Sequence, residues 1–253
     1  MTAIREAPDS EATPWLHRLA VRAGFTLIQI VERVIGRYSL VGLEPFLDPA
    51  RFSWVPDLEA CWPDIRAELD LLLARHAELP NFQDISVDQR SLTSDDRWKT
   101  YFFSAYGVRS ESNCARCPRT ARALERVPGM TTAMFSILSP HKAIPEHRGP
   151  YKGVLRYHLG LVVPEDSAGC GLEVGGVVAH WHERQSLIFD DTYRHRAWND
   201  TDDLRVVLFL DVVRPLRAPV SWVNRSVIKA IALSPYVRHG RKRQREWERR
   251  FGC

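Results

Sequence analysis

The sequence predicts a mainly β fold, an antiparallel sandwich or barrel with helices before and after it. The second half of the chain contains short apolar runs rich in Val, Leu, Ile and Phe, which are residues 131–139, 153–163, 170–179, 185–190 and 204–213. Gly-Pro, Pro-Glu-Asp, Gly-Gly and Asn-Asp turn signals separate these runs, as expected for short strands. No helical pattern lies between them, which favours an antiparallel arrangement over a parallel α/β sheet.

Composition places the chain among ordinary soluble globular proteins. Its 253 residues are 45% hydrophobic and 26% charged, which excludes wholesale disorder, collagen-like repeats and polytopic membrane proteins. The 35 Lys and Arg exceed the 31 Asp and Glu by four, but 11 of the basic residues and only two Glu lie from Arg214 onward. The last forty residues therefore carry +9 and residues 1–213 carry −5, so an acidic body precedes a strongly basic tail.

Three regions are expected: an N-terminal helical region over residues 1–79, a β domain over residues 80–213, and the basic tail over residues 214–253. An apolar stripe at helical spacing runs through residues 15–41 and predicts a helix. Its longest charge-free run, Ala23 to Val31, has nine residues, short of the ~20 that span a bilayer. This helix either packs on the body or lies on a membrane surface, and no signal-peptide cleavage site follows it.

Four further elements are predicted before the apolar runs. Apolar residues at spacings of three and four predict an amphipathic helix over residues 57–77. The polar residues 80–97 predict a loop, and residues 98–106 predict a strand. A short helix over residues 118–127 is expected to begin at Pro118, because proline is favoured in the first turn of a helix.

The strand predicted over residues 153–163 has two different faces. Four apolar side chains share one face, and they are Leu155, Tyr157, Leu159 and Leu161. Arg156 and His158 share the other face, because successive side chains of a strand point to opposite sides. Two large polar side chains that point the same way from a barrel strand predict a lined pocket.

The five cysteines predict no disulfide framework, because their number is odd and they are scattered through the chain. This pattern favours a reducing compartment. Cys114 and Cys117 form a CxxC pair, but a structural zinc site needs a second pair of ligands at similar spacing, and the sequence has none. The pair is therefore interpreted as two small apolar residues near the start of a helix.

Three residues outline a possible metal site. His147 is expected in a turn between two strands, His195 after a strand that ends in acidic residues, and Arg205 inside the last strand. Imidazole suits iron, copper, nickel and zinc, and a buried arginine favours a carboxylate that its planar fork can grip. Histidines are often only hydrogen-bonded, however, and Arg205 could equally pair with Asp190 or Asp203. These residues alone predict a possible metal–carboxylate pocket in a small β-barrel.

Several motifs, in order, resemble the aspartyl/asparaginyl β-hydroxylase family over about residues 98–215. They are Ser136-Ile137-Leu138, His147-Arg148-Gly149-Pro150, Leu155 to Leu161, Phe189 to His195, and Arg205. Within the family the sequence is most similar to the bacterial lipid A 2-hydroxylase branch, through further matches at Trp98-Lys99, Cys117-Pro118, Ala133-Met134-Phe135 and His180-Trp181. The resemblance implies a double-stranded β-helix (jelly-roll) core and an Fe(II)- and 2-oxoglutarate-dependent dioxygenase.

The resemblance implies that His147 and His195 bind Fe(II), where dioxygen is activated. The usual iron triad adds a carboxylate two residues after the first histidine, and this sequence has Gly149 there. The animal aspartyl hydroxylases also show glycine at this position, so hydroxylation stays compatible with it. A water or another anion could fill the position, a halide included, and Asp190 or Asp191 could supply a replacement oxygen ligand.

The resemblance also assigns the cosubstrate contacts. Arg205 would pair with the distal carboxylate of 2-oxoglutarate, and Ser136 would hydrogen-bond the same group. Arg156 and His158 match residues near the other end of the cosubstrate.

Two enzymatic hypotheses follow for the substrate. The first is hydroxylation of an unactivated C–H on a lipid acyl chain (lipid A-like) by a cytoplasmic enzyme at the inner membrane face. The second is a soluble dioxygenase that hydroxylates or halogenates an aspartyl/asparaginyl peptide, an amino acid or a biosynthetic intermediate. A binding module with an inactive site is the non-enzymatic alternative.

The basic tail bears on this choice. A helical stripe is formed by Val220, Val223, Val227, Ile228 and Ile231. Residues 238–250 then hold seven Lys and Arg and two Glu, with aromatic residues interleaved. A basic amphipathic helix of this kind fits an anionic membrane, which predicts peripheral contact through residues 219–253. The alternatives are a helix packed on the acidic body and, more weakly, nucleic acid, which we do not expect because the basic run is short.

Overall fold

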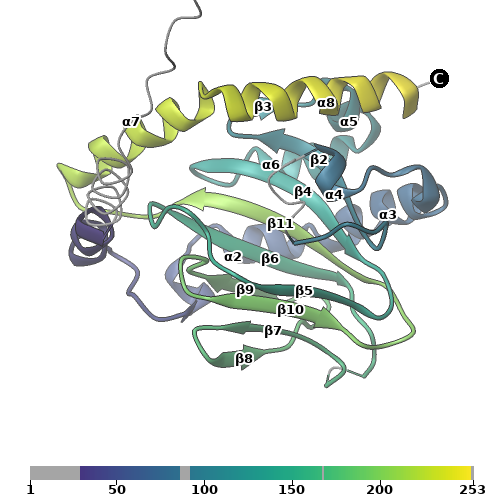
Figure 1. The fold of residues 1–253 in the computed structure, drawn as a ribbon, viewed down its shortest axis with the longest axis horizontal. Coiled ribbons are helices and arrows are strands. Elements are labelled where there is room, and N and C mark those ends of the chain that lie inside the picture. Colours follow the sequence, from purple (N-terminus) through teal and green to yellow (C-terminus); the bar gives the residue numbers. More distant parts are fainter. Residues whose placement is uncertain (1–28, 86–91, 167, 252–253) are drawn as a thin grey trace, which may run out of the picture.

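A computed structural model describes residues 29–85, 92–166 and 168–251 (Figure 1). Within these ranges residues 29–37 are helical. Most of the helix predicted over residues 15–41 lies outside the described residues, and so does the last cysteine, Cys253.

Two antiparallel sheets form the core. The large sheet has the order β1 (Phe46–Leu47), β9 (Ser186–Phe189), β6 (Val154–Val162), β11 (Arg205–Val213), β4 (Met130–Leu138), β2 (Trp98–Ala105) and β3 (Val108–Arg109). The small sheet has the order β5 (Lys142–His147), β10 (His195–Asn199), β7 (Cys170–Val174) and β8 (Val177–Ala179). From β4 onward the chain alternates between the sheets, which is the topology of a double-stranded β-helix, or jelly roll. The predicted fold class is confirmed.

The predicted strands need three corrections. The run over residues 170–179 is a hairpin of two strands, β7 and β8, because Gly175 and Gly176 adopt positive φ and turn the chain. His147 does not lie in a turn: it ends strand β5. His195 begins strand β10, which had no predicted counterpart. Both strands escaped prediction because they mix charged and apolar residues, and β5 also contains a proline.

The helix predicted over residues 57–77 is also corrected. It is two helices, α2 (Val55–Ala60) and α3 (Trp62–Leu73), separated at Cys61. Pro63 explains the break, because proline has no N–H for the helical hydrogen bond and is tolerated only in a first turn. A short helix, α4 (Phe82–Ile85), lies in the segment predicted as a loop. The helices α5 (Glu111–Arg116) and α6 (Pro118–Leu124) follow β3, and α6 begins near Pro118 as predicted.

The two faces of the large sheet have different environments. Helices α2 and α3 lie behind the outer face in Figure 1, where the Trp62 indole N–H donates a 2.7 Å hydrogen bond to the Gly160 carbonyl. The four apolar residues predicted to share a face of β6 all belong to this outer core. Arg156 and His158 face the small sheet instead, among residues such as Phe209. The space between the two sheets is therefore lined by polar as well as apolar side chains.

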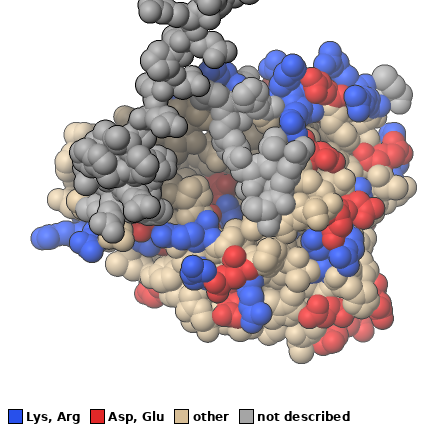
Figure 2. Space-filling view, viewed as in Figure 1, with Lys and Arg blue, Asp and Glu red and all other residues tan. Residues whose placement is uncertain are grey.

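The basic tail divides into two helices with different surroundings. In α8 (Pro235–Phe251) the side chains of Val237 and Phe251 are buried against the body, and Figure 2 shows Lys and Arg along the edge where α8 runs. In α7 (Val220–Ala232), by contrast, Trp222 is 66% exposed and Val223 61% exposed. Packing on the body thus describes α8, whereas α7 keeps part of its apolar stripe in solvent. None of the described helices is long and apolar enough to cross a bilayer.

The CxxC pair lies at the junction of two helices. Cys114 is inside α5, Cys117 precedes α6, and both are buried free thiols. Burial raises the pKa of Cys117 to about 12, so its unreactive thiol form prevails near neutral pH. These observations agree with the interpretation of the pair as small apolar residues.

Candidate active site

Two histidines meet at one end of the small sheet. His147 and His195 are opposite each other in the β5–β10 pairing, and their ring centroids are 4.1 Å apart. Backbone carbonyls hold both rings: His147 Nδ1 lies 2.8 Å from the Pro145 oxygen and His195 Nδ1 lies 2.9 Å from the Tyr193 oxygen. A carbonyl can only accept, so each Nδ1 carries the proton and each Nε2 keeps a free lone pair.

Both histidines are neutral at pH 7. Burial lowers the pKa of His147, and it lowers that of His195 to about 3, with the nearby Arg156 guanidinium adding to the effect. Neutral imidazole is the form that binds a metal ion. The pair therefore offers two nitrogen lone pairs at one place, whichever metal is considered.

Asp191 occupies the space beside Gly149. The Gly149 N–H donates to the Asp191 carbonyl at 2.6 Å, and a Cβ placed on Gly149 would lie 2.2 Å from Asp191 Oδ2. The carboxylate is buried, and one oxygen pairs with Arg156 Nη2 at 2.9 Å. Burial outweighs this pairing and raises the pKa of Asp191 to about 6. Glycine is needed at position 149 because any side chain would collide with this carboxylate.

Asp190, the other acidic candidate, has structural partners. Its carboxylate pairs with Arg214 and, at 2.6 Å, with Lys152 Nζ, and it also accepts from Thr192. Asp190 and Arg214 are both fully buried. The two adjacent aspartates thus have separate surroundings, and only Asp191 lies beside Gly149.

Arg205 lies deeper between the sheets, near Ser136. It is 2% exposed, donates to the Ser136 carbonyl at 3.3 Å and stacks over the Trp181 ring at 4.6 Å. Neither Asp190 nor Asp203 pairs with it, and no carboxylate among the described residues lies within ion-pair distance. Burial lowers the pKa of Arg205 to about 10, so the guanidinium stays charged at pH 7. A buried, charged arginine of this kind is suited to binding a carboxylate.

Arg156 and His158 lie between the histidine pair and Arg205. Arg156 also pairs with Asp211, at 3.1 Å, and its guanidinium stacks over Phe209. The His158 ring packs 5.2 Å from the Phe209 ring, and its Nδ1 accepts a 3.2 Å hydrogen bond from the Trp181 indole. Burial holds the pKa of His158 well below its ordinary value, so this ring is neutral too.

The structure brings all the site residues predicted from the sequence to the space between the two sheets. These six residues are Ser136, His147, Arg156, His158, His195 and Arg205. Sequence reasoning assigned no role to Trp98 and Trp181, although both stood in the quoted motifs. The Trp98 indole donates to Ser136 Oγ at 3.0 Å, and Trp181 contacts both Arg205 and His158. Only the fold shows these contacts, because β2 and the segment before β9 are distant in sequence from β4 and β11.

The fold and these residues define a jelly-roll protein with a polar site between its two sheets. Residues 59–215 match the Aspartyl/Asparaginyl beta-hydroxylase family, and the chain belongs to this family. The match confirms the resemblance and extends it to the N-terminal side, where α3 covers the large sheet.

Relatives in the family act on different substrates. The chain is 48% identical over 226 residues to an ornithine lipid ester-linked acyl 2-hydroxylase of Rhizobium tropici, covering 89% of this chain and 80% of the relative. It is 27% identical over 227 residues to human aspartyl/asparaginyl beta-hydroxylase, covering 86% of this chain but 28% of that protein. A solved prolyl hydroxylase from Trichoplax adhaerens is 12% identical, with a TM-score of 0.46 over 87% of this chain and 99% of that one.

Proposed function

We propose that this protein is an Fe(II)- and 2-oxoglutarate-dependent dioxygenase that hydroxylates an unactivated C–H of a lipid acyl chain. The observation that carries the proposal is the 48% identity to a lipid acyl 2-hydroxylase along 89% of the chain. In this proposal the enzyme works from the cytoplasm at the inner membrane face. The human relative supports a second candidate, an aspartyl/asparaginyl peptide substrate, at lower identity.

The residues present fit the iron and the cosubstrate. Nine buried side-chain polar atoms of the described residues have no hydrogen-bond partner, and four of the nine belong to this site: His195 Nε2, His158 Nε2, Asp191 Oδ1 and Arg205 Nε. Buried polar groups are nearly always satisfied in folded proteins, so a cluster of unsatisfied ones favours a missing ligand. Neutral imidazoles suit iron, and a buried guanidinium suits a dicarboxylate.

Each side chain has a distinct task in this proposal. His147 and His195 hold iron through Nε2, while the carbonyls on their Nδ1 atoms fix the ring orientations. Arg205 and Ser136 hold the distal carboxylate of 2-oxoglutarate. Iron, the cosubstrate and dioxygen together supply an oxidant strong enough for an unactivated C–H. The surrounding aromatic side chains exclude water, which protects the protein and substrate from side reactions.

Replacing Gly149 with Ala is expected to lower the affinity for Fe(II) by about 10- to 100-fold, as is typical when groups around a metal ligand are disturbed. The added Cβ would lie 2.2 Å from Asp191 Oδ2, so the carboxylate must move out of its place. Calorimetric titration of the metal-free protein measures the affinity. Gly36→Ala is the matched control, because its Cβ would meet Leu43 at an ordinary 3.4 Å. If Gly149→Ala binds Fe(II) as tightly as the wild type does, Asp191 has no role in the proposed iron site.

Exposed apolar side chains lie on two segments, residues 30–43 and residues 222–233, that contact the loop after His147. This mouth patch consists of Ile30, Val34, Leu40, Leu43, Trp222, Val223 and Leu233. Backbone contacts join the first segment to the residues just before α7, including Leu40 N–H to the Pro215 carbonyl at 3.0 Å. Both segments also reach the loop after His147: Arg148 pairs with Glu32 at 2.6 Å, and the Tyr151 hydroxyl donates to Asn224 in α7 at 2.7 Å.

A bilayer is the partner proposed for the mouth patch. Exposed apolar patches mark interaction surfaces, and the cations Arg225 and Lys229 on α7 add attraction to anionic lipids. Contact here would bring the lipid substrate to the entrance of the site.

Vesicle flotation tests this contact. Wild-type protein is expected to float with phosphatidylglycerol vesicles at low salt, and Trp222→Ser/Val223→Ser is expected to remain at the bottom of the gradient. Each exposed large side chain contributes roughly 1–3 kcal/mol when buried in the interface, so the double change removes most of the affinity. Leu71→Ser, at a 75% exposed position on α3, is the matched control and should float normally. Wild-type protein that fails to float would contradict the membrane proposal.

Mass spectrometry of the product tests the proposed function. Purified protein with Fe(II), 2-oxoglutarate and an ester-linked acyl lipid is expected to add one oxygen atom to the lipid and to release succinate in equal amount. His147→Ala and His195→Ala should do neither, because each loses one of the two proposed iron ligands. Hydroxylation of an aspartyl/asparaginyl peptide in place of the lipid would favour the second candidate. Absence of succinate from the wild-type protein with every substrate would refute the dioxygenase proposal.

A further inference from the structure

A large cavity lies between α8 and the inner face of the large sheet. Its volume is about 1130 Å³, slightly above the roughly 300–1,000 Å³ of typical ligand pockets. Its apolar lining comes from α4, β2, β4, β11 and α8, namely Phe82, Ile85, Phe102, Met134, Phe209 and Val237. We call this cavity the α8 groove.

The α8 groove adjoins the candidate active site. Arg156 and Phe209 line both: Arg156 pairs with Asp191 beside Gly149, and the Phe209 ring packs against His158. A molecule that lies along the groove therefore contacts Arg156, whose guanidinium pairs with Asp191 beside Gly149.

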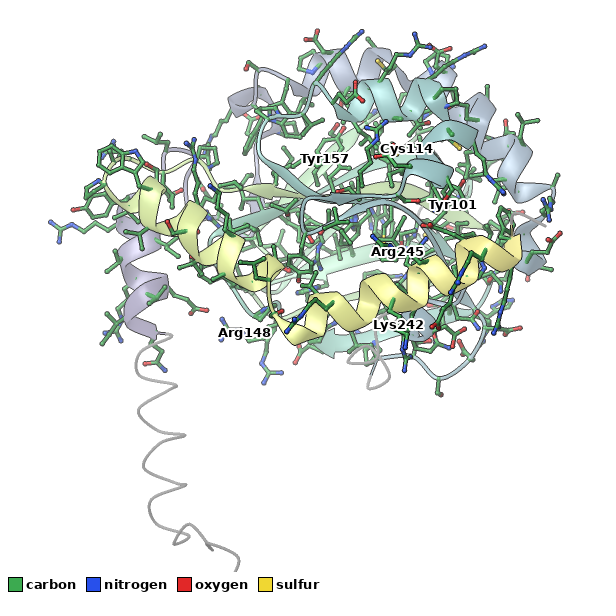
Figure 3. All side chains as sticks on the ribbon, turned by 90° about the horizontal axis from the view of Figure 1, so that it is seen from above. Tyr101, Cys114, Arg148, Tyr157, Lys242 and Arg245 are labelled. Atoms are coloured by element: carbon green, nitrogen blue, oxygen red, sulfur yellow. The ribbon has the colours of Figure 1, made fainter. Side chains whose placement is uncertain are left out.

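Two cations at the groove have no assigned structural role. Lys242 and Arg245 line the groove from α8 (Figure 3), and neither has a hydrogen bond or ion pair with another described residue. Arg243 and Arg109, by contrast, already donate to Asp84 and Glu125. The groove thus combines apolar side chains with two unpaired positive charges. Four acidic residues also line it, and three of them, Glu111, Asp211 and Glu248, already pair with Arg109, Arg156 and Ser110.

We propose that the α8 groove binds an anionic amphiphile, with an acyl chain along Phe102, Met134 and Phe209 and its anionic group against Lys242 and Arg245. This inference rests on the proposed function and assigns the lipid a binding site that the family match alone does not specify. The apolar side chains of the groove suit a methylene chain, which needs no hydrogen-bonding partner. The two cations suit a carboxylate or phosphate.

Binding of dansyl-labelled undecanoic acid to the metal-free, full-length protein tests this site without turnover. Ala105 lines the groove and packs with its apolar cluster, so Ala105→Trp fills the space. We expect this change to weaken binding about tenfold or more, because an overfilled cavity cannot accept the chain. Ala74→Trp, at an exposed position after α3, is the matched control and should bind like wild type. Circular dichroism confirms that both variants are folded.

The charge is tested separately. Lys242→Gln/Arg245→Gln should weaken binding of the acid about 3- to 30-fold while leaving binding of its methyl ester unchanged. Arg250→Gln, an exposed arginine of α8 outside the groove, should affect neither ligand. Equal losses for acid and ester would overturn the assignment of the anion to these cations.

The outcomes separate this inference from the proposed function. Normal probe binding by folded Ala105→Trp would overturn the groove as the acyl site, even if the wild type hydroxylates a lipid. Probe binding that depends on Ala105 and the two cations, in a protein that hydroxylates no lipid, would uphold the groove and overturn the proposed function. Displacement of the probe by an aspartyl/asparaginyl peptide would assign the groove to a peptide and overturn the lipid inference.

Discussion

Replacing Arg205 with Met is expected to make the metal-free protein more stable and to abolish efficient use of 2-oxoglutarate. The guanidinium is almost fully buried, its Nε has no partner, and no carboxylate among the described residues neutralises it. Such a charge destabilises the free protein and becomes favourable only when an anion binds. Met fills much of the same volume without the charge, so stability and function should change in opposite directions.

The expected magnitudes are large enough to measure. Loss of a buried charge partner costs about 2–5 kcal/mol of binding, which weakens 2-oxoglutarate affinity by about 30- to 5000-fold. Removal of the unsatisfied Arg205 guanidinium should raise the free energy of unfolding of the ligand-free protein by about 1–3 kcal/mol, as measured by thermal melting. Arg196→Met, an exposed arginine on β10 that pairs with Glu173, should change neither quantity. A destabilised Arg205→Met protein that keeps its 2-oxoglutarate affinity would show that Arg205 is structural.

Replacing Asp190 with Asn is expected to destabilise the fold by about 3–5 kcal/mol, the usual cost of removing one partner of a buried ion pair. Asp190 and Arg214 are both fully buried, and Lys152 pairs with the same carboxylate. Asn cannot neutralise the two cations, of which Arg214 would remain fully buried and Lys152 partly buried. Urea denaturation at pH 7 measures the loss, and Asp202→Asn at an exposed position is the control.

The same substitution should change how stability depends on pH. Burial raises the pKa of Asp190, but Arg214, Lys152 and Thr192 lower it by more, so it lies below its ordinary value. A carboxyl with a depressed pKa contributes its full stability above the unfolded-state pKa of about 4 and loses it as the pH falls through the folded-state pKa. The stability difference between wild type and Asp190→Asn should therefore be constant near neutral pH and shrink below about pH 4. A difference that stays constant into acid would contradict this account.

The predictable strands are those with strong hydrophobic patterns. The runs that became β4, β6, β9 and β11 are rich in buried aliphatic residues, and the structure places them side by side in the large sheet. Strands β5 and β10 carry the two histidines and have weak patterns, because function and solvent exposure mix polar residues into them. Local hydrophobic patterns therefore predicted the central strands of the large sheet and missed the two strands that carry the histidines.

The site could be predicted only as a set of residues. Motifs identified all six positions, but their mutual placement depends on strand register, which a single sequence does not specify. Arg214 illustrates the limit: it was counted as the first charge of the basic tail, yet it lies inside the body and neutralises Asp190. The contact between Asp191 and Gly149 was equally hidden, because it joins two loops from different strands.

The placement of Arg205 and Phe209 on one strand has a consequence for ligand choice. Both side chains face the interior from β11, four residues apart, which corresponds to roughly 13 Å along a strand. Strand β4 pairs with β11 continuously from Arg205 through Phe209, whereas the pairing with β6 begins at Val206 and shifts register between Val206 and Val207. The β4 ladder therefore fixes the separation of the two side chains, and we expect the site to discriminate between ligands by their length more strictly than a flexible loop would.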